Sequence, residues 1–159
     1  MELSNLLSGL IGAVIGGLLS YFGSIKAAEK SIKAVYEQES EKRKEEEEKA
    51  RASTVKRLLA EVNENLALTE NIMVNNAKIR FITEAWSTAK GDIYFLSEEL
   101  QENLQKSYTK IHRYNVLVDY DLGKVSYGGG FLDQPLLKAA EEVKEALLSC
   151  KDKLESWRG

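Results

Sequence analysis

The first 25 residues contain the feature that most limits how this chain can fold, a long stretch without a charged side chain. Residues 3–25, LSNLLSGLIGAVIGGLLSYFGSI, run for 23 positions before the first lysine, Lys26. At about 1.5 Å of rise per residue, residues 6–25 would form a helix of roughly 30 Å, which matches the hydrocarbon thickness of a bilayer. The stretch therefore predicts a transmembrane helix over residues 1–25.

The charges around this stretch predict its orientation. No Lys or Arg precedes it, whereas Lys26, Lys30 and Lys33 follow it closely. By the positive-inside rule, this asymmetry places the N-terminus outside the cell and the rest of the chain in the cytoplasm. We expect an uncleaved single-pass anchor in the cell membrane, because the basic leader and cleavage site of a signal peptide are missing. A cleaved signal and an apolar helix of a soluble protein are the alternatives.

Small side chains recur along one face of the predicted span. Gly12 and Gly16 form a GxxxG match, and such faces let two helix backbones approach closely in lipid. We therefore predict that the span self-associates into a homo-oligomer, although glycine is common in transmembrane helices in general. The predicted association residues are Ser8, Gly9, Gly12, Ala13, Gly16, Gly17, Ser20 and Ser24.

Residues 26–54 are predicted to form a charged helical stalk that continues the first helix. Four apolar residues at heptad-like spacing lead into it, namely Ile25, Ala28, Ile32 and Val35. Residues 37–49 contain no apolar side chain, but their acids and bases stand at i,i+4 spacing, which supports a solvated helix. A flexible tether and an electrostatic contact with a partner are the alternatives.

Residues 55–159 are predicted to form a small antiparallel helical bundle, so that the whole chain is all-α. The chain contains one Pro, and abundant Glu, Lys, Leu and Ala favour helix. The first bundle helix has a periodic stripe that we expect to face the core: Val55, Leu58, Leu59, Val62, Leu66, Thr69, Ile72 and Met73.

Capping residues predict where the later helices begin. Thr83 is the expected N-cap of a short helix ending at Gly91, and Ser97 begins a longer one. The buried stripe expected in that helix is Leu100, Leu104, Tyr108, Ile111, Asn115 and Val118. A last helix, capped by Asp133, either closes the bundle or pairs with a copy of itself along Leu136, Ala140, Val143, Leu147, Cys150, Leu154 and Trp157.

Residues 119–134 are predicted to be a loop, because Gly123 and three further consecutive glycines interrupt the helical pattern. Asp119 and Asp121 suggest calcium, but the other ligands of an EF-hand are missing. Lys124 after Gly123 suggests a phosphate loop, but the preceding glycine of that motif is missing. We expect a plain connection, long enough to contact a partner protein.

The rest of the sequence contains no pattern typical of catalysis, so we expect neither an enzyme nor a cofactor or metal site. His112 has no acidic or thiol companion at ligand spacing, and Cys150 stands in an apolar stripe where cysteine acts as a small hydrophobic residue. The net charge of −3 argues against nucleic acid as a partner. The expected partners are the lipid bilayer, further copies of the chain and a cytoplasmic protein.

Two segments, LLAEVNENLALTENI and FITEAWSTAKGDIYFLSEELQENLQKSYTKIHRYNVLV, resemble a loose group of short prokaryotic and phage membrane proteins without an assigned function. The resemblance covers about residues 58–118 and depends on Asn63, Asn65, Trp86, Gly91, residues 96–100 and Asn115. It implies a single span with a cytoplasmic helical domain and adds no activity.

These observations predict a membrane-anchored, self-associating helical interaction or scaffold protein. One alternative is a small homo-oligomeric channel whose pore is lined by the small-residue face of the span, although the span lacks the elements of a selective filter. A further alternative is an enzyme built on the loop at residues 119–134.

Overall fold

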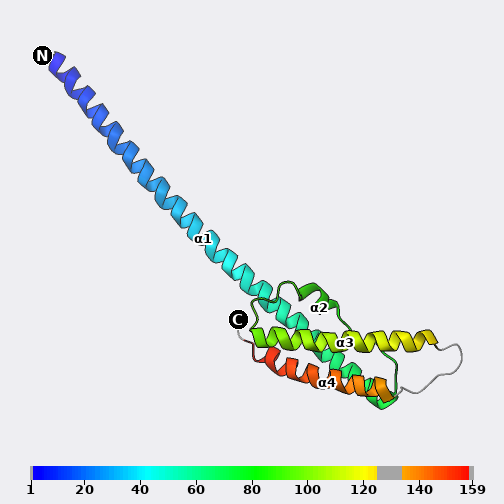
Figure 1. Cartoon of the computed structure of the whole chain (residues 1–159). Coiled ribbons are helices and arrows are strands. Elements are labelled where there is room, and N and C mark those ends of the chain that lie inside the picture. Colours follow the sequence, from blue (N-terminus) through cyan, green and yellow to red (C-terminus); the bar gives the residue numbers. More distant parts are fainter. Residues whose placement is uncertain (1, 125–133, 158–159) are drawn as a thin grey trace. The chain divides into compact units, whose positions relative to one another are not determined.

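The computed structural model of the chain describes residues 2–124 and 134–157, with the side chains of residues 2–8, 10, 11, 123 and 124 left out of the description. Within these residues the protein is all-α, as predicted, and contains four helices and no strand. The helices are α1 (Glu2–Asn75), α2 (Glu84–Ala89), α3 (Glu98–Lys124) and α4 (Gln134–Glu155) (Figure 1). The chain divides into two compact units, Met1–Glu47 and Glu48–Gly159, which we call unit 1 and unit 2.

The predicted membrane span is wrong. Among the residues that the structure describes, no helix combines the length and the apolar character needed to cross a bilayer. Residues 12–25, the unbroken run of described side chains before Lys26, make a helix of about 21 Å, which is shorter than the roughly 30 Å of a bilayer core. The single-pass localisation with the N-terminus outside is overturned with it, whereas the lipid bilayer as a partner stays a prediction.

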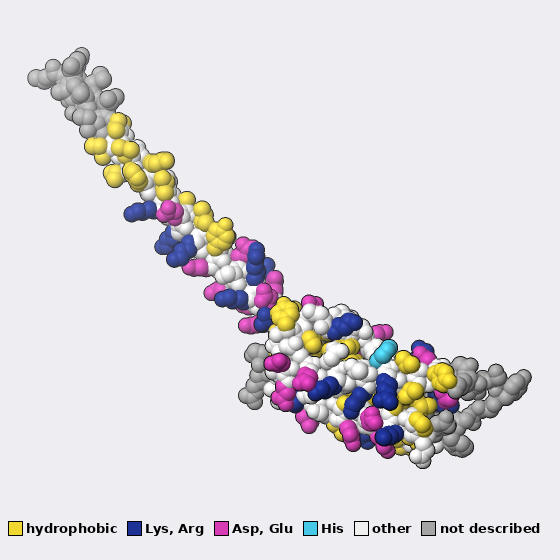
Figure 2. All heavy atoms as spheres, in the orientation of Figure 1, with side chains coloured by type: hydrophobic (Ala, Val, Ile, Leu, Met, Phe, Trp, Pro, Cys, Tyr) yellow, Lys and Arg dark blue, Asp and Glu magenta, His cyan; other side chains and the backbone are white. Residues whose placement is uncertain are grey.

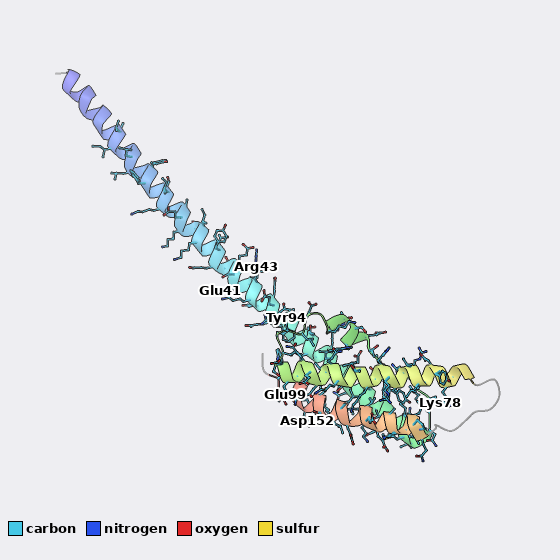
Figure 3. All side chains as sticks on the ribbon, viewed as in Figure 1. Glu41, Arg43, Lys78, Tyr94, Glu99 and Asp152 are labelled. Atoms are coloured by element: carbon cyan, nitrogen blue, oxygen red, sulfur yellow. The ribbon has the colours of Figure 1, made fainter. Side chains whose placement is uncertain are left out.

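Unit 1 is helical throughout its described residues, including the charged segment. Ion pairs at i,i+4 spacing support that segment, as predicted: Arg43 lies 2.6 Å from Glu39, and Lys42 lies 4.0 Å from Glu46 (Figure 3, where Arg43 is labelled). Each exposed pair of this kind contributes only about 0.3–0.5 kcal/mol. The flexible tether is therefore wrong for this part of the chain, while the predicted boundaries at residues 25 and 54 stay predictions.

Unit 2 has one apolar core, to which all four helices contribute, because each presents an apolar stripe at helical spacing. Helices α3 and α4 pack side by side and run antiparallel. The start of α3 meets the end of α4, where Lys153 donates a hydrogen bond of 2.6 Å to Glu99 (labelled in Figure 3). Farther along, Lys110 donates to the carbonyl of Glu142.

The last helix closes the bundle of its own chain. Six of its seven predicted stripe residues are buried, namely Leu136, Ala140, Val143, Leu147, Cys150 and Leu154, and Trp157 is partly buried. In α3 the predicted stripe is buried at Leu100, Leu104, Tyr108, Ile111 and Val118, and partly buried at Asn115. These stripes explain why an antiparallel pair forms at the centre of the unit.

The predicted loop begins too early. Helix α3 continues through Asp119, Asp121 and Gly123 to Lys124, so these positions are helical. Two ion pairs, Lys78 with Asp121 and Arg80 with Asp119, connect this last part of α3 to the segment that follows α1. The other predicted features of the loop, the three glycines at 128–130 and the Asp133 cap, lie outside the described residues.

Candidate functional site

Unit 1 exposes a dense set of apolar side chains, shown as yellow spheres on its helix in Figure 2. Ten large apolar residues of its described part are between 39% and 69% exposed: Val14, Ile15, Leu18, Leu19, Tyr21, Phe22, Ile25, Ile32, Val35 and Tyr36. Single exposed apolar residues are ordinary, but a contiguous exposed patch marks an interaction site. This apolar surface is the first candidate functional site.

The structure places the predicted small-residue face on the same helix, open to solvent. A Cβ atom added to Gly9, Gly12, Gly16 or Gly17 would meet no atom within 4 Å. Ala13, Ser20 and Ser24 are exposed, and the Ser8 side chain lies outside the described part. These residues lie along one helix of a single chain, and their association with another chain stays a prediction.

The main polar group inside unit 2 is the carboxylate of Glu61 on α1, which is only 5% exposed. It accepts hydrogen bonds from the backbone N–H of Ala85 at 2.6 Å, the N–H of Trp86 at 3.1 Å and the hydroxyl of Tyr108 at 2.7 Å. Ala85 and Trp86 lie in the first turn of α2. The carboxylate therefore caps α2, whereas Thr83, at the predicted cap position, makes no side-chain capping bond.

Aromatic packing and burial complete this polar centre. The ring of Tyr108 stacks on that of Trp86, with centroids 4.8 Å apart and planes 6° apart. Burial raises the pKa of the Tyr108 hydroxyl, and its hydrogen bond to the Glu61 carboxylate raises it further. Tyr108 therefore keeps its proton and remains a donor to Glu61 over the ordinary range of pH.

Two asparagines hold the segment between α1 and α2 against the bundle. The side-chain amide of Asn65 on α1 accepts from the N–H of Ile82 and donates to its carbonyl, both at 2.8 Å. Asn115 on α3 does the same to Phe81, both at 2.9 Å. We call these two paired contacts the asparagine clasps. They satisfy the backbone groups of residues that belong to no helix.

A surface cleft of about 310 Å³ between α2 and α3 contains His112, the only histidine. Its lining consists of hydroxyl, amide, aromatic and cationic side chains: Thr83, Trp86, Ser87, Lys90, Gln105, Tyr108, Thr109 and His112. No carboxylate or thiol is among these described lining residues, so the cleft does not bring together the pairs used in carboxylate or thiol catalysis.

The single cysteine occupies a buried structural position. The sulfur of Cys150 lies 3.1 Å from the hydroxyl oxygen of Ser107 on α3. Burial raises the pKa of the Cys150 thiol above its ordinary value, which disfavours the reactive thiolate. Among the residues that the structure describes, no three potential ligands are grouped so that they could hold a metal ion.

Sequence patterns did not identify Glu61 as a central residue, although they placed its neighbours on the buried face of α1. Glu61 and Asn65 stand at i,i+4 within the stripe formed by Leu58, Val62 and Thr69. Polar residues within an apolar stripe are the signal that would have found them, because buried polar groups require hydrogen-bond partners.

No protein-family model matches this chain, and no curated protein or solved structure matches it either. The resemblance to short prokaryotic and phage proteins therefore stays a prediction.

Proposed function

We propose that this chain is a self-associating helical interaction protein in which unit 1 joins copies of the chain and unit 2 serves as a scaffold for a protein partner. The exposed apolar surface of unit 1 is the observation that carries the proposal. Covering this surface would remove apolar area from water, which stabilises the contact by about 25 cal/mol per Å² of buried area. Neither catalysis nor a cofactor is part of the proposed function.

The glycine content of unit 1 also supports association. Gly9, Gly12, Gly16, Gly17 and Gly23 all lie inside α1. Each costs about 1 kcal/mol relative to Ala in a helix interior, so the five cost on the order of 5 kcal/mol together. A helix with this cost needs stabilising contacts along its length, and packing against another chain would supply them.

Features of unit 2 support the scaffold role. Its core is continuous, and the Glu61 centre and the asparagine clasps fix the segment between α1 and α3. A preorganised surface loses little conformational entropy when it binds a partner. The bundle can therefore present its outer faces without rearranging.

Sedimentation velocity of the intact chain over a wide concentration range tests the self-association. We expect the mass to exceed that of one chain and to rise with concentration, since association follows mass action. A single monomeric species at every concentration would remove the basis of the proposal. Val74→Ser is a suitable control variant, because it removes an exposed apolar side chain from unit 2 and should leave the mass unchanged.

A further inference from the structure

We propose that unit 1 pairs with a second copy of itself through one apolar seam rather than through its small-residue face. The seam consists of Val14, Leu18, Tyr21, Ile25, Ala28, Ile32 and Val35. This inference rests on the proposed self-association and specifies the surface and the partner.

The spacing of the seam matches that of a coiled coil. Its members follow one another in alternating steps of four and three residues, which keeps all of them on one side of a helix. Three exposed residues, Ile15, Phe22 and Tyr36, each stand one position after a seam residue and widen the apolar surface on one side. Because successive residues are about 100° apart around the helix, Gly12, Gly16 and Ser20 lie on the opposite side, whereas Gly17 and Ser24 lie beside the seam.

The area of the seam fits what a stable pair of helices needs. An apolar side chain of this size removes on the order of 100 Å² from water when it is covered. Six large seam residues and the three flanking residues therefore offer roughly 900 Å² per chain, close to the 800 Å² per partner of a standard protein interface. Each of the nine is more than a third exposed in the single chain.

The charges near the seam favour an identical chain over a strongly charged partner. Residues 26–47 contain six Lys or Arg and seven Glu, so their net charge is −1. Part of this charge is already paired within the helix, as in Arg43 with Glu39 and Lys33 with Glu37. Two copies consequently meet without strong mutual repulsion, whereas a highly acidic or basic partner would find no complementary field.

The sequence also sets where the paired stretch ends. The next positions of the same heptad series are Glu39 and Lys42, which would place charged groups inside the seam. Burying them unpaired is costly, whereas exposed in water they are well solvated. The seam therefore ends at Val35, and the charged part of unit 1 stays outside the contact.

The test compares three variants of the intact chain by sedimentation velocity and native mass spectrometry. Leu18→Glu with Ile25→Glu places charges in the seam, and we expect the dissociation constant to rise by more than about tenfold. Ala27→Glu with Ala34→Glu is the matched control, since both residues are exposed and lie on the opposite side of the helix, and it should keep the wild-type assembly. The variant Gly12→Leu with Gly16→Leu should also keep the wild-type assembly, because a side chain added at either position meets open space in the single chain.

The outcomes separate the inference from the proposed function. The seam would be overturned, with self-association intact, if the Leu18→Glu, Ile25→Glu variant assembled as strongly as the wild type. The same conclusion would follow if only the Gly12→Leu, Gly16→Leu variant lost assembly. A monomeric wild-type chain would overturn both. Fluorescence of the two tryptophans, Trp86 and Trp157, which pack in or against the core of unit 2, reports whether each variant retains the folded bundle.

Discussion

Two buried tyrosines of α3 differ in what surrounds their hydroxyl groups. Tyr108 donates to Glu61 at 2.7 Å, whereas the Tyr114 hydroxyl is buried without a hydrogen-bond partner among the residues that the structure describes. Both rings pack on aromatic neighbours, Trp86 and Phe81 respectively. The two positions therefore allow the cost and the benefit of a buried hydroxyl to be separated within one helix.

Replacement of each tyrosine by phenylalanine should change stability in opposite directions. Tyr108→Phe removes a hydrogen bond to a carboxylate and should lower the free energy of unfolding by about 1.5–3 kcal/mol. Tyr114→Phe removes an unpaired buried hydroxyl and should raise it by about 1 kcal/mol. Urea unfolding followed by circular dichroism measures both, and equal losses in the two variants would contradict the contrast.

The same hydroxyls should make the fold sensitive to alkaline pH. Burial raises the pKa of Tyr114 from 10.0 to about 12, and the pKa of Tyr108 is raised as well. When the pKa of a tyrosine is higher in the folded state than in the unfolded state, its contribution to stability is complete below the unfolded pKa of about 10. That contribution is lost as the pH rises through the pKa of the folded state. Urea unfolding between pH 9 and pH 12 should show the decrease. The Tyr108→Phe, Tyr114→Phe double variant should show a smaller decrease, and an unchanged slope would count against this origin.

The burial of individual residues could be predicted from the sequence where it follows the helical period. It was less predictable where a long-range contact determines it. The stripes of α3 and α4 were correct at nearly every apolar position, because burial follows the period of the helix. Glu61 was missed since its partners Ala85, Trp86 and Tyr108 lie 24 to 47 residues away along the chain. Its place in the apolar stripe marks Glu61 as buried, but the local sequence does not identify its partners.

At the scale of the elements, the asparagine clasps give the segment between α1 and α2 its fixed position. Asn65→Asp and Asn115→Asp keep an acceptor for the backbone N–H but remove the donor to the carbonyl. We expect amide hydrogen exchange at Phe81 and Ile82 to become faster in these variants. It should be faster still in Asn65→Ala and Asn115→Ala, which remove both donor and acceptor. Asn71→Asp, at an exposed position of α1, serves as the control. Unchanged exchange at Phe81 and Ile82 would show that the clasps do not hold the segment.

The limits of the helices were less predictable than their existence. The sequence placed a loop from Asp119 because Gly123 and later glycines break the helical pattern. Helix α3 nonetheless continues to Lys124, and the ion pairs of Asp119 and Asp121 with Arg80 and Lys78 connect this turn to the segment after α1. Tertiary contacts outweighed the low helix propensity of a single glycine, which is worth about 1 kcal/mol.

At the scale of the whole molecule, self-association should make the helix of unit 1 depend on protein concentration. Its five glycines lower its intrinsic stability, so pairing along the seam would supply what the isolated helix lacks. Far-ultraviolet circular dichroism at increasing concentration should show rising helix content, and Gly16→Ala should raise the content at low concentration. Helix content that does not vary with concentration would contradict the link between pairing and helix formation.

The membrane prediction shows where composition misled at this scale. The absence of charge predicted a span, but no helix in the described part of the chain combines the length and the apolar character that a span requires. The exposed apolar residues between Val14 and Val35 also recur in steps of four and three, the spacing on which the proposed pairing rests.

The capping of α2 by Glu61 has a consequence for the order in which unit 2 folds. A helix of six residues cannot persist alone, because the cost of nucleation exceeds the few hydrogen bonds it gains. Its cap comes from a residue 24 positions earlier, and the cap is itself held by Tyr108 on α3. Helix α2 therefore forms only after α1 and α3 have met, so it belongs to the late side of the folding barrier and is among the first parts lost when the protein unfolds.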